Sequence, residues 1–157
     1  MVRQFPRFWG LVVLPVFLAL PALTGTANAQ SHPALTPECV SQVDHFLADR
    51  LALWQQRLLL ADWKIDVLQA HPSDLKPKTL GNIHWDADKK VATIRVMDLS
   101  DYQLSCHDTL DDMEFTIVHE LIHLELSSLP RSEASRRDEE YAVNRLTEAY
   151  LKLDRKR

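Results

Sequence analysis

The spacing of apolar residues predicts a long amphipathic helix over residues 37–60. Apolar side chains recur there at steps of three and four residues, at Val40, Val43, Leu47, Leu51, Trp54 and Leu58. Positions spaced in this way lie on one face of an α-helix. Thr36 before the run suits an N-cap, and Pro37 suits the first turn, where the backbone N–H has no helical partner. We therefore expect a helix that buries one face.

The period changes from helical to alternating in the middle of the chain. In WKIDVL, residues 63–68, large apolar side chains alternate with charged ones, which is typical of a half-buried strand. A loop with two prolines follows. Residues 82–85 and 91–96 then flank the polar segment DADKK, and this arrangement predicts a β-hairpin. We expect a small, mostly antiparallel sheet of about three strands.

The helical period returns near Asp108 and predicts two further helices. The first covers residues 109–127 and is capped by Asp108 or Thr109. Its early acidic residues are Asp111, Asp112 and Glu114. Its apolar face is formed by Phe115, Val118, Leu121 and Ile122. The last helix opens at Ser132 or Ser135. Its expected core stripe is Ala142, Val143, Leu146, Ala149, Tyr150 and Leu153. The order helix, sheet, helix, helix predicts an α+β fold.

The first 29 residues have the pattern of a secretory signal peptide. Arg3 and Arg7 give a positive start, and residues 8–20 are apolar. The segment ANA, residues 27–29, supplies the small residues that precede a cleavage site. An uncleaved anchor is the alternative, but the apolar run is short for a membrane-spanning helix. We expect an exported mature domain of residues 30–157, periplasmic or secreted, without stable membrane association after cleavage.

The charge of the chain argues against a nucleic-acid partner. The sequence has 18 basic and 22 acidic residues and a formal net charge of −4. Residues 1–29 hold two basic and no acidic side chains, so removing them changes the charge from −4 to −6. No basic stripe remains that could hold a phosphate backbone, and we expect no nucleic acid to bind.

Two cysteines, Cys39 and Cys106, are the only ones in the chain. An even count in a chain that enters an oxidising compartment permits a disulfide between them. Two buried free thiols are the alternative.

The segment TIVHELIHLEL, residues 116–126, carries the chemistry. Residues four apart lie one turn from each other on a helix, so His119 and His123 point to the same side. HELIH is an HExxH motif, in which the two imidazoles bind Zn²⁺ and the glutamate, here Glu120, acts as the base toward the water that zinc activates. Burying these groups among apolar residues is unfavourable unless each finds a partner.

The third zinc ligand must come from outside the motif, because a catalytic zinc has three protein ligands and an open position. No histidine follows His123, so a carboxylate of the last helix is the remaining source. The acidic residues there are Glu133, Asp138, Glu139, Glu140 and Glu148. We prefer Glu140, because Asn144 stands one turn further on and can hydrogen-bond the outer nitrogen of a ligand histidine. Glu139 is the alternative, because it lies nearer the middle of the expected core stripe.

HELIH on one helix, EYAVNRLT (140–147) on the next and a small sheet before them resemble the compact gluzincin metallopeptidases, often called minigluzincins. EYAVNRLT is also similar to the Glu-x-x-Ala-Asn-x-Phe-Ala run of the ImmA/IrrE-like members, in which the third zinc ligand falls on the position of Glu140. Val143 stands where that group has alanine. The resemblance extends over about residues 63–153 and implies a zincin-like fold and peptidase activity.

These observations predict zinc-dependent hydrolysis of a peptide or protein substrate, with Glu120 as the base. Tyr141, Tyr102 and His84 are the candidates for an oxyanion-stabilising group, although a structural role is the stronger expectation for each. Substrate would lie along the edge of the strand at 91–96. A di-iron protein is disfavoured, because only one Glu-x-x-His pair is present. The remaining alternative is a catalytically silent, metal-stabilised binding module or inhibitor of the same fold.

Overall fold

The elements follow one another in the expected order of helix, sheet, helix, helix. The computed structural model describes residues 36–130 and 132–156, and the predicted signal peptide lies outside them. The helices are α1 (Pro37–Arg57), α2 (Cys106–Glu125) and α3 (Glu133–Asp154), and the strands are β1 (Lys64–Ala70), β2 (Gly81–Asp86) and β3 (Val91–Met97). The predicted α+β class is confirmed. No helix in this part of the chain is long and apolar enough to cross a membrane.

The sheet is mixed, with the strands in the order β1-β3-β2. The predicted hairpin is present, because β2 and β3 pair antiparallel. β1 pairs parallel with β3, from Lys64 opposite Val91 to Ala70 opposite Met97. One of the two strand pairs is thus parallel, where we expected mostly antiparallel pairing. β3 is paired on both sides, so the expectation that substrate lies along its edge is wrong, and β2 is the edge strand on the side of the hairpin.

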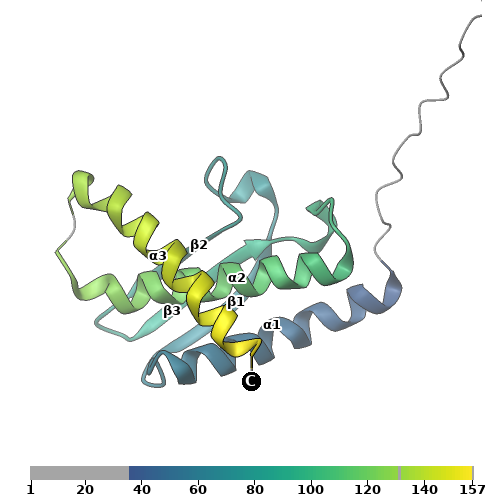
Figure 1. Cartoon of the computed structure of the whole chain (residues 1–157), viewed down its shortest axis with the longest axis horizontal. Helices are drawn as coiled ribbons and strands as arrows, with labels where there is room; N and C mark the ends of the chain where they lie inside the picture. Colours follow the sequence, from purple (N-terminus) through teal and green to yellow (C-terminus); the bar gives the residue numbers. More distant parts are fainter. Residues whose placement is uncertain (1–35, 131, 157) are drawn as a thin grey trace, which may run out of the picture. The chain divides into compact units, whose positions relative to one another are not determined.

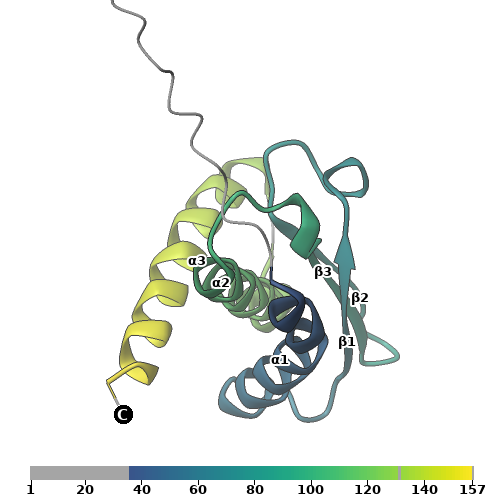
Figure 2. The ribbon, with the colours of Figure 1, turned by 90° about the vertical axis from the view of Figure 1, so that its right-hand side faces the viewer.

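The helices cover one face of the sheet in two layers, with α2 at the centre (Figure 2). α1 contacts α2 and β1, α2 contacts β2 and β3, and α3 contacts α2. Figure 1 shows α3 crossing α2 on the side away from the sheet. α2 therefore has neighbours on several sides, and its side chains Met113, Ile117 and Leu121 are completely buried.

α1 begins where the sequence predicts, because the Thr36 side chain accepts a hydrogen bond from the Cys39 backbone N–H at 3.2 Å. It ends at Arg57 rather than residue 60, and Leu59 takes a left-handed conformation with φ of 57°. Val40 is 54% exposed, so it does not belong to the buried face, and Cys39 is buried instead.

A disulfide joins Cys39 to Cys106 and so ties the first turn of α1 to the first turn of α2. The alternative of two free thiols is therefore wrong. The bond closes a separation of 67 residues, which contributes about 4 kcal/mol in the chain-entropy model. A disulfide of this kind is compatible with an exported protein.

The start of α2 differs from the prediction. Ser105, rather than Asp108 or Thr109, is the N-cap, and its hydroxyl accepts from the Asp108 backbone N–H at 3.2 Å. Because the helix starts earlier, Glu114 lies beyond the first turn. Its buried carboxylate accepts a hydrogen bond from Trp54 Nε1 at 2.7 Å and thereby links α2 to α1.

α3 is capped by Ser132, with Ser135 completing a capping box, as expected. Its core stripe is narrower than predicted. Val143, Thr147 and Leu151 are buried, whereas most of the expected stripe is exposed: Ala142, Leu146, Ala149, Tyr150 and Leu153. The physical reason is that α3 has α2 as its main neighbour, and a helix packed on one partner buries a row of four-residue steps.

Candidate metal centre

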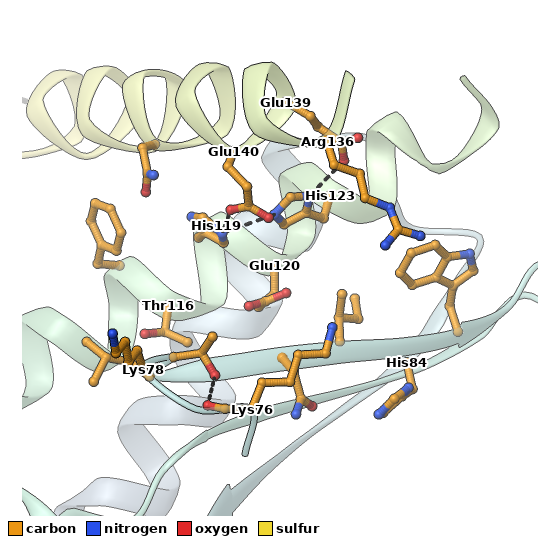
Figure 3. A pocket seen from close by; sticks show the side chains of 18 residues that line it. Lys76, Lys78, His84, Thr116, His119, Glu120, His123, Arg136, Glu139 and Glu140 are labelled. Atoms are coloured by element: carbon orange, nitrogen blue, oxygen red, sulfur yellow. Dashed lines mark hydrogen bonds and ion pairs between the residues drawn. The ribbon is translucent and has the colours of Figure 1, made fainter. Parts of the chain in front are cut away.

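The HELIH segment lies in the C-terminal half of α2 and opens into a cleft of about 700 Å³. The walls of the cleft are α2, α3, β2 and the loop that precedes β2 (Figure 3). The His119 side chain is 16% exposed and the His123 side chain 11%. Both imidazoles are thus shielded from bulk water but remain open to the cleft.

Three of the predicted donor groups meet in this cleft. The Nε2 atoms of His119 and His123 are 3.1 Å apart. Glu140 faces both rings, with Oε2 at 3.5 Å from His119 Nε2 and Oε1 at 3.3 Å from His123 Nε2. One ligand atom from each residue lies within 4.8 Å of the other two. The structure therefore brings together the two histidines of one helix and the carboxylate of the next.

These donors fit a zinc ion by their chemistry. Two imidazole nitrogens and one carboxylate are a known catalytic zinc set, which leaves a position for water. Burial is the main cause that lowers the pKa of His119, with the nearby His123 acting in the same direction. A lowered pKa keeps the ring neutral near pH 7, and only a neutral imidazole binds a metal.

Glu139 is the half-buried neighbour of the metal-facing group rather than a member of it. Its Oε1 lies 2.9 Å from His123 Nδ1, the ring nitrogen that faces away from His119, and its side chain is 15% exposed, against 57% for Glu140. A carboxylate on the outer nitrogen of a ligand histidine fixes its tautomer and orientation. The helical phase that made Glu139 an alternative ligand indicates its burial correctly, because Val143 follows it by one turn.

Asn144 stands beside a candidate ligand histidine, as the sequence suggested. It lines the cleft, and its side chain makes a hydrogen-bond contact with the His119 ring that acts to raise the pKa of that ring. Within residues 36–130 and 132–156, however, the buried His119 Nδ1 has no hydrogen-bond partner. Glu139 lies at hydrogen-bond distance from the outer nitrogen of His123, whereas Asn144 stands beside His119 without good hydrogen-bond geometry to its Nδ1 atom.

Glu120 points from α2 into the space between the histidines and the sheet (Figure 3). The residue is only 7% exposed, and burial is the main cause that raises its pKa to about 7. The charge of Glu140 adds to this rise, whereas His123 and Lys76 oppose it. A cation bound nearby would lower the pKa again. In the described part of the chain no hydrogen bond holds this carboxylate, so it is available to a ligand in the cleft.

The close approach of β2 to α2 depends on Gly81. A Cβ atom there would lie 2.3 Å from Thr116 Cγ2 and 2.6 Å from the Arg95 carbonyl oxygen. Neither contact is possible for a real side chain without movement of the strand. Gly81 therefore allows β2 to pack closely against Thr116 of α2 at the wall of the cleft.

Of the three candidates for an oxyanion-stabilising group, only His84 lines the cleft. The Tyr102 hydroxyl donates to Asp112 at 2.8 Å, and the residue is buried away from the cleft. Tyr141 is 70% exposed and does not line the cleft. His84 borders the cleft, but its ring points away from Glu120 (Figure 3). It lies opposite Thr93 in the hairpin.

Sequence reasoning missed the basic side chains of the cleft. Lys76 and Lys78 come from the loop before β2, and Arg136 comes from the second turn of α3. Isolated basic residues in a loop carry no motif, so nothing in the sequence distinguishes them from solvated surface groups.

A second group of possible metal donors lies outside the cleft. His71 directly follows β1, and Asp98 directly follows the parallel neighbour β3. Together with Asp101 they place one ligand atom each within 4.8 Å of one another. His71 Nδ1 and Asp101 Oδ2 are 2.7 Å apart.

Comparison with known proteins gives no match: no family model fits the chain, and no curated protein or solved structure is significantly similar to it. The function must therefore be argued from the geometry of the site.

Proposed function

We propose that this protein is a zinc metallopeptidase of the gluzincin type, with His119, His123 and Glu140 as metal ligands and Glu120 as general base. The observation that carries the proposal is the meeting of the HExxH imidazoles with a carboxylate from α3. Glu120, the glutamate of the motif, lines the same open cleft.

Zn²⁺ bound to these three residues would supply Lewis acidity toward a carbonyl group and toward water. The protein side chains do the rest. Glu120 lines the same cleft next to the histidines, so its carboxylate can accept a proton from the attacking water and deliver it to the leaving nitrogen. Glu139 orients the His123 ring from behind.

Two features favour turnover over a structural metal site. A structural zinc site is usually closed by four protein ligands, whereas among the described residues three donors meet here. A carboxylate that binds no metal and has no hydrogen-bond partner in the described chain is also costly to bury. A catalytic role of Glu120 would explain why this carboxylate is buried despite that cost.

The disulfide and the signal-like segment 1–29 support export to an oxidising compartment, periplasmic or extracellular. We propose that the mature domain, residues 30–157, acts there on peptide or protein substrates. Secretion of the full chain with loss of residues 1–29, read from the N-terminus of the exported protein, is the direct test.

The experiment that tests the activity compares Glu120→Gln with the wild-type protein. Both are loaded with one equivalent of Zn²⁺ and incubated with unfolded, reduced and alkylated casein. We expect Glu120→Gln to lose hydrolysis by about a hundredfold or more, because general-base catalysis typically contributes that much. Its zinc content, measured by plasma mass spectrometry, should not change.

Glu125→Gln is the matched control, since Glu125 lies on the same helix and is exposed. It should cleave casein like the wild type. If the zinc-loaded wild type and Glu120→Gln are equally inactive and equally stable, the peptidase assignment fails. The protein is then a metal-stabilised binding module.

A further inference from the structure

The cleft beside Glu120 carries an unusual share of basic side chains for an acidic protein. The chain has a formal net charge of −4, yet Lys76, Lys78 and Arg136 all line this one cleft. The acidic residues that line it are Glu120, Glu139 and Glu140. The three basic and three acidic side chains cancel, so a bound dication would leave a surplus of two positive charges.

Each of these acids already has a task within the site. Glu139 faces His123 Nδ1 at 2.9 Å, Glu140 faces both Nε2 atoms, and Glu120 is the buried base. The basic side chains have no such task. Within the described residues none of the three forms an ion pair, whereas Lys89 and Lys90 of the hairpin turn are paired with Asp86 and Asp62.

Two of the basic groups, Lys76 and Arg136, line the cleft from different elements, the loop before β2 and α3. Figure 3 shows Lys76 extending from the loop and Arg136 reaching from α3, so that both end on the side of Glu120 away from Lys78. An ammonium and a guanidinium group that line one cleft are the two side-chain groups that bind carboxylates in proteins.

Building on the proposed peptidase function, we infer that the cleft selects substrates with a carboxylate close to the scissile bond, bound between Lys76 and Arg136. The carboxylate comes either from an Asp or Glu side chain of the substrate or from its free C-terminus. In both cases a charge-assisted hydrogen bond to each basic group fixes the peptide relative to Glu120.

The test measures binding, so it does not depend on hydrolysis. Zinc-loaded Glu120→Gln protein is titrated into fluorescein-labelled decapeptide pools of random composition, and the dissociation constant is read from fluorescence anisotropy. One pair of pools has a free or an amidated C-terminus and contains no acidic residue. A second pair is amidated and contains Glu or Gln at one central position.

We expect the carboxylate-bearing pool of one pair to bind about tenfold more tightly than its neutral counterpart, the effect of one or two charge-assisted hydrogen bonds. The pair that shows the difference identifies the source of the carboxylate. Lys76→Gln combined with Arg136→Gln should reduce the ratio to about one, and Lys76→Glu should favour pools with Lys at the central position.

Lys64→Gln combined with Arg137→Gln is the matched control, because both residues are exposed and neither lines the cleft. This double variant should keep the tenfold ratio. The inference is overturned if neither pair of pools shows a preference, or if the control variant abolishes the preference as fully as the cleft variant does.

Failure of the inference and failure of the peptidase proposal are distinguishable. Cleavage of casein with no preference for either carboxylate pool leaves the peptidase standing and removes the selectivity. A carboxylate preference without any cleavage by the wild type keeps the binding site and removes the peptidase.

Discussion

The two histidine–carboxylate groups of this protein differ in what surrounds their donor atoms. In both groups one ligand atom per residue lies within 4.8 Å of the others. In the cleft the two histidine side chains are 16% and 11% exposed and rise from one rigid helix. At the ends of β1 and β3 the His71 side chain is 62% exposed. Short distances between donors are common to both, so distance alone does not identify a metal site.

The exposed group already has its hydrogen bonds. Asp98 accepts from the Ser100 backbone N–H at 2.9 Å and from the Ser100 hydroxyl at 2.5 Å, and so caps the short turn at Leu99–Asp101. Asp101 is paired with His71. A metal would have to displace a proton and compete with these contacts. In the cleft the donors also contact one another, since the two Nε2 atoms are 3.1 Å apart and Glu140 faces both. The difference is that burial lowers the pKa of His119 and so favours the neutral ring that a metal requires.

The largest expected difference between the groups is in metal stoichiometry. We expect the wild-type mature domain to hold about one zinc per chain after dialysis against a weak chelator. His123→Ala should lose nearly all of the zinc, because the two ligands that remain, His119 and Glu140, do not hold the ion tightly enough. His71→Ala should retain it. Plasma mass spectrometry on the dialysed proteins gives the answer.

Circular dichroism of the same samples controls for folding. A zinc content that falls with His71→Ala and survives His123→Ala would exchange the roles of the two groups. A content near zero in folded wild-type protein, with metal supplied in excess, would remove the candidate metal centre altogether.

A smaller difference in zinc affinity is expected between variants of Glu139 and Glu140, the two neighbouring acids of α3. Glu140→Gln should weaken zinc binding most, since it removes a donor atom. Glu139→Gln should weaken it by about 10- to 100-fold, the usual cost of removing a carboxylate behind a ligand histidine. Zinc affinities from competition with a fluorescent chelator measure both changes, and Glu148→Gln, an exposed position on the same helix, is the control. Equal affinity for wild type and Glu140→Gln would make Glu139 the third ligand.

Much of the fold could be predicted from local sequence signals, because capping and alternation act over a few residues. Thr36 and Ser132 cap their helices as expected, and the hairpin strands lie where the pattern indicates. The parallel pairing of β1 with β3 is a long-range choice that no local signal specifies. The exposure of Leu146 and Leu153 likewise reflects how few neighbours α3 has, which periodicity does not reveal.

The candidate site divides in the same way. His119, Glu120 and His123 follow from a motif with a fixed helical spacing, and the structure brings Glu140 to them from α3. The roles of the outer residues were predicted less well. Asn144 was expected behind a ligand histidine, and Glu139 occupies that kind of position on the other ring. A shift of one residue along a helix turns a side chain by about 100°, and the rotation of α3 on α2 depends on packing.

The smallest expected effect is a difference in proton affinity between the two histidine environments. In the metal-free protein, His71 should titrate above its ordinary pKa of 6.5, because it is hydrogen-bonded to Asp101 and attracted by its charge. His119 should titrate below 6.5, because burial disfavours its charged form. Imidazole ¹H–¹⁵N NMR spectra, recorded in steps across this range and assigned with His71→Ala, measure both values.

The two shifts also have opposite signs in their effect on folding. The His71–Asp101 pair stabilises the fold below about pH 6.5, the value in the unfolded chain, and this contribution disappears as the pH rises through the higher folded pKa of His71. His119 acts in reverse: as the pH falls below about 6.5 the unfolded chain binds its proton first, so the metal-free fold loses stability. An Asp101→Asn variant should remove the first effect and leave the second. If His71 instead titrated below 6.5, its contact with Asp101 would not persist in solution, and the two histidine environments would no longer differ in the sign of their pKa shifts.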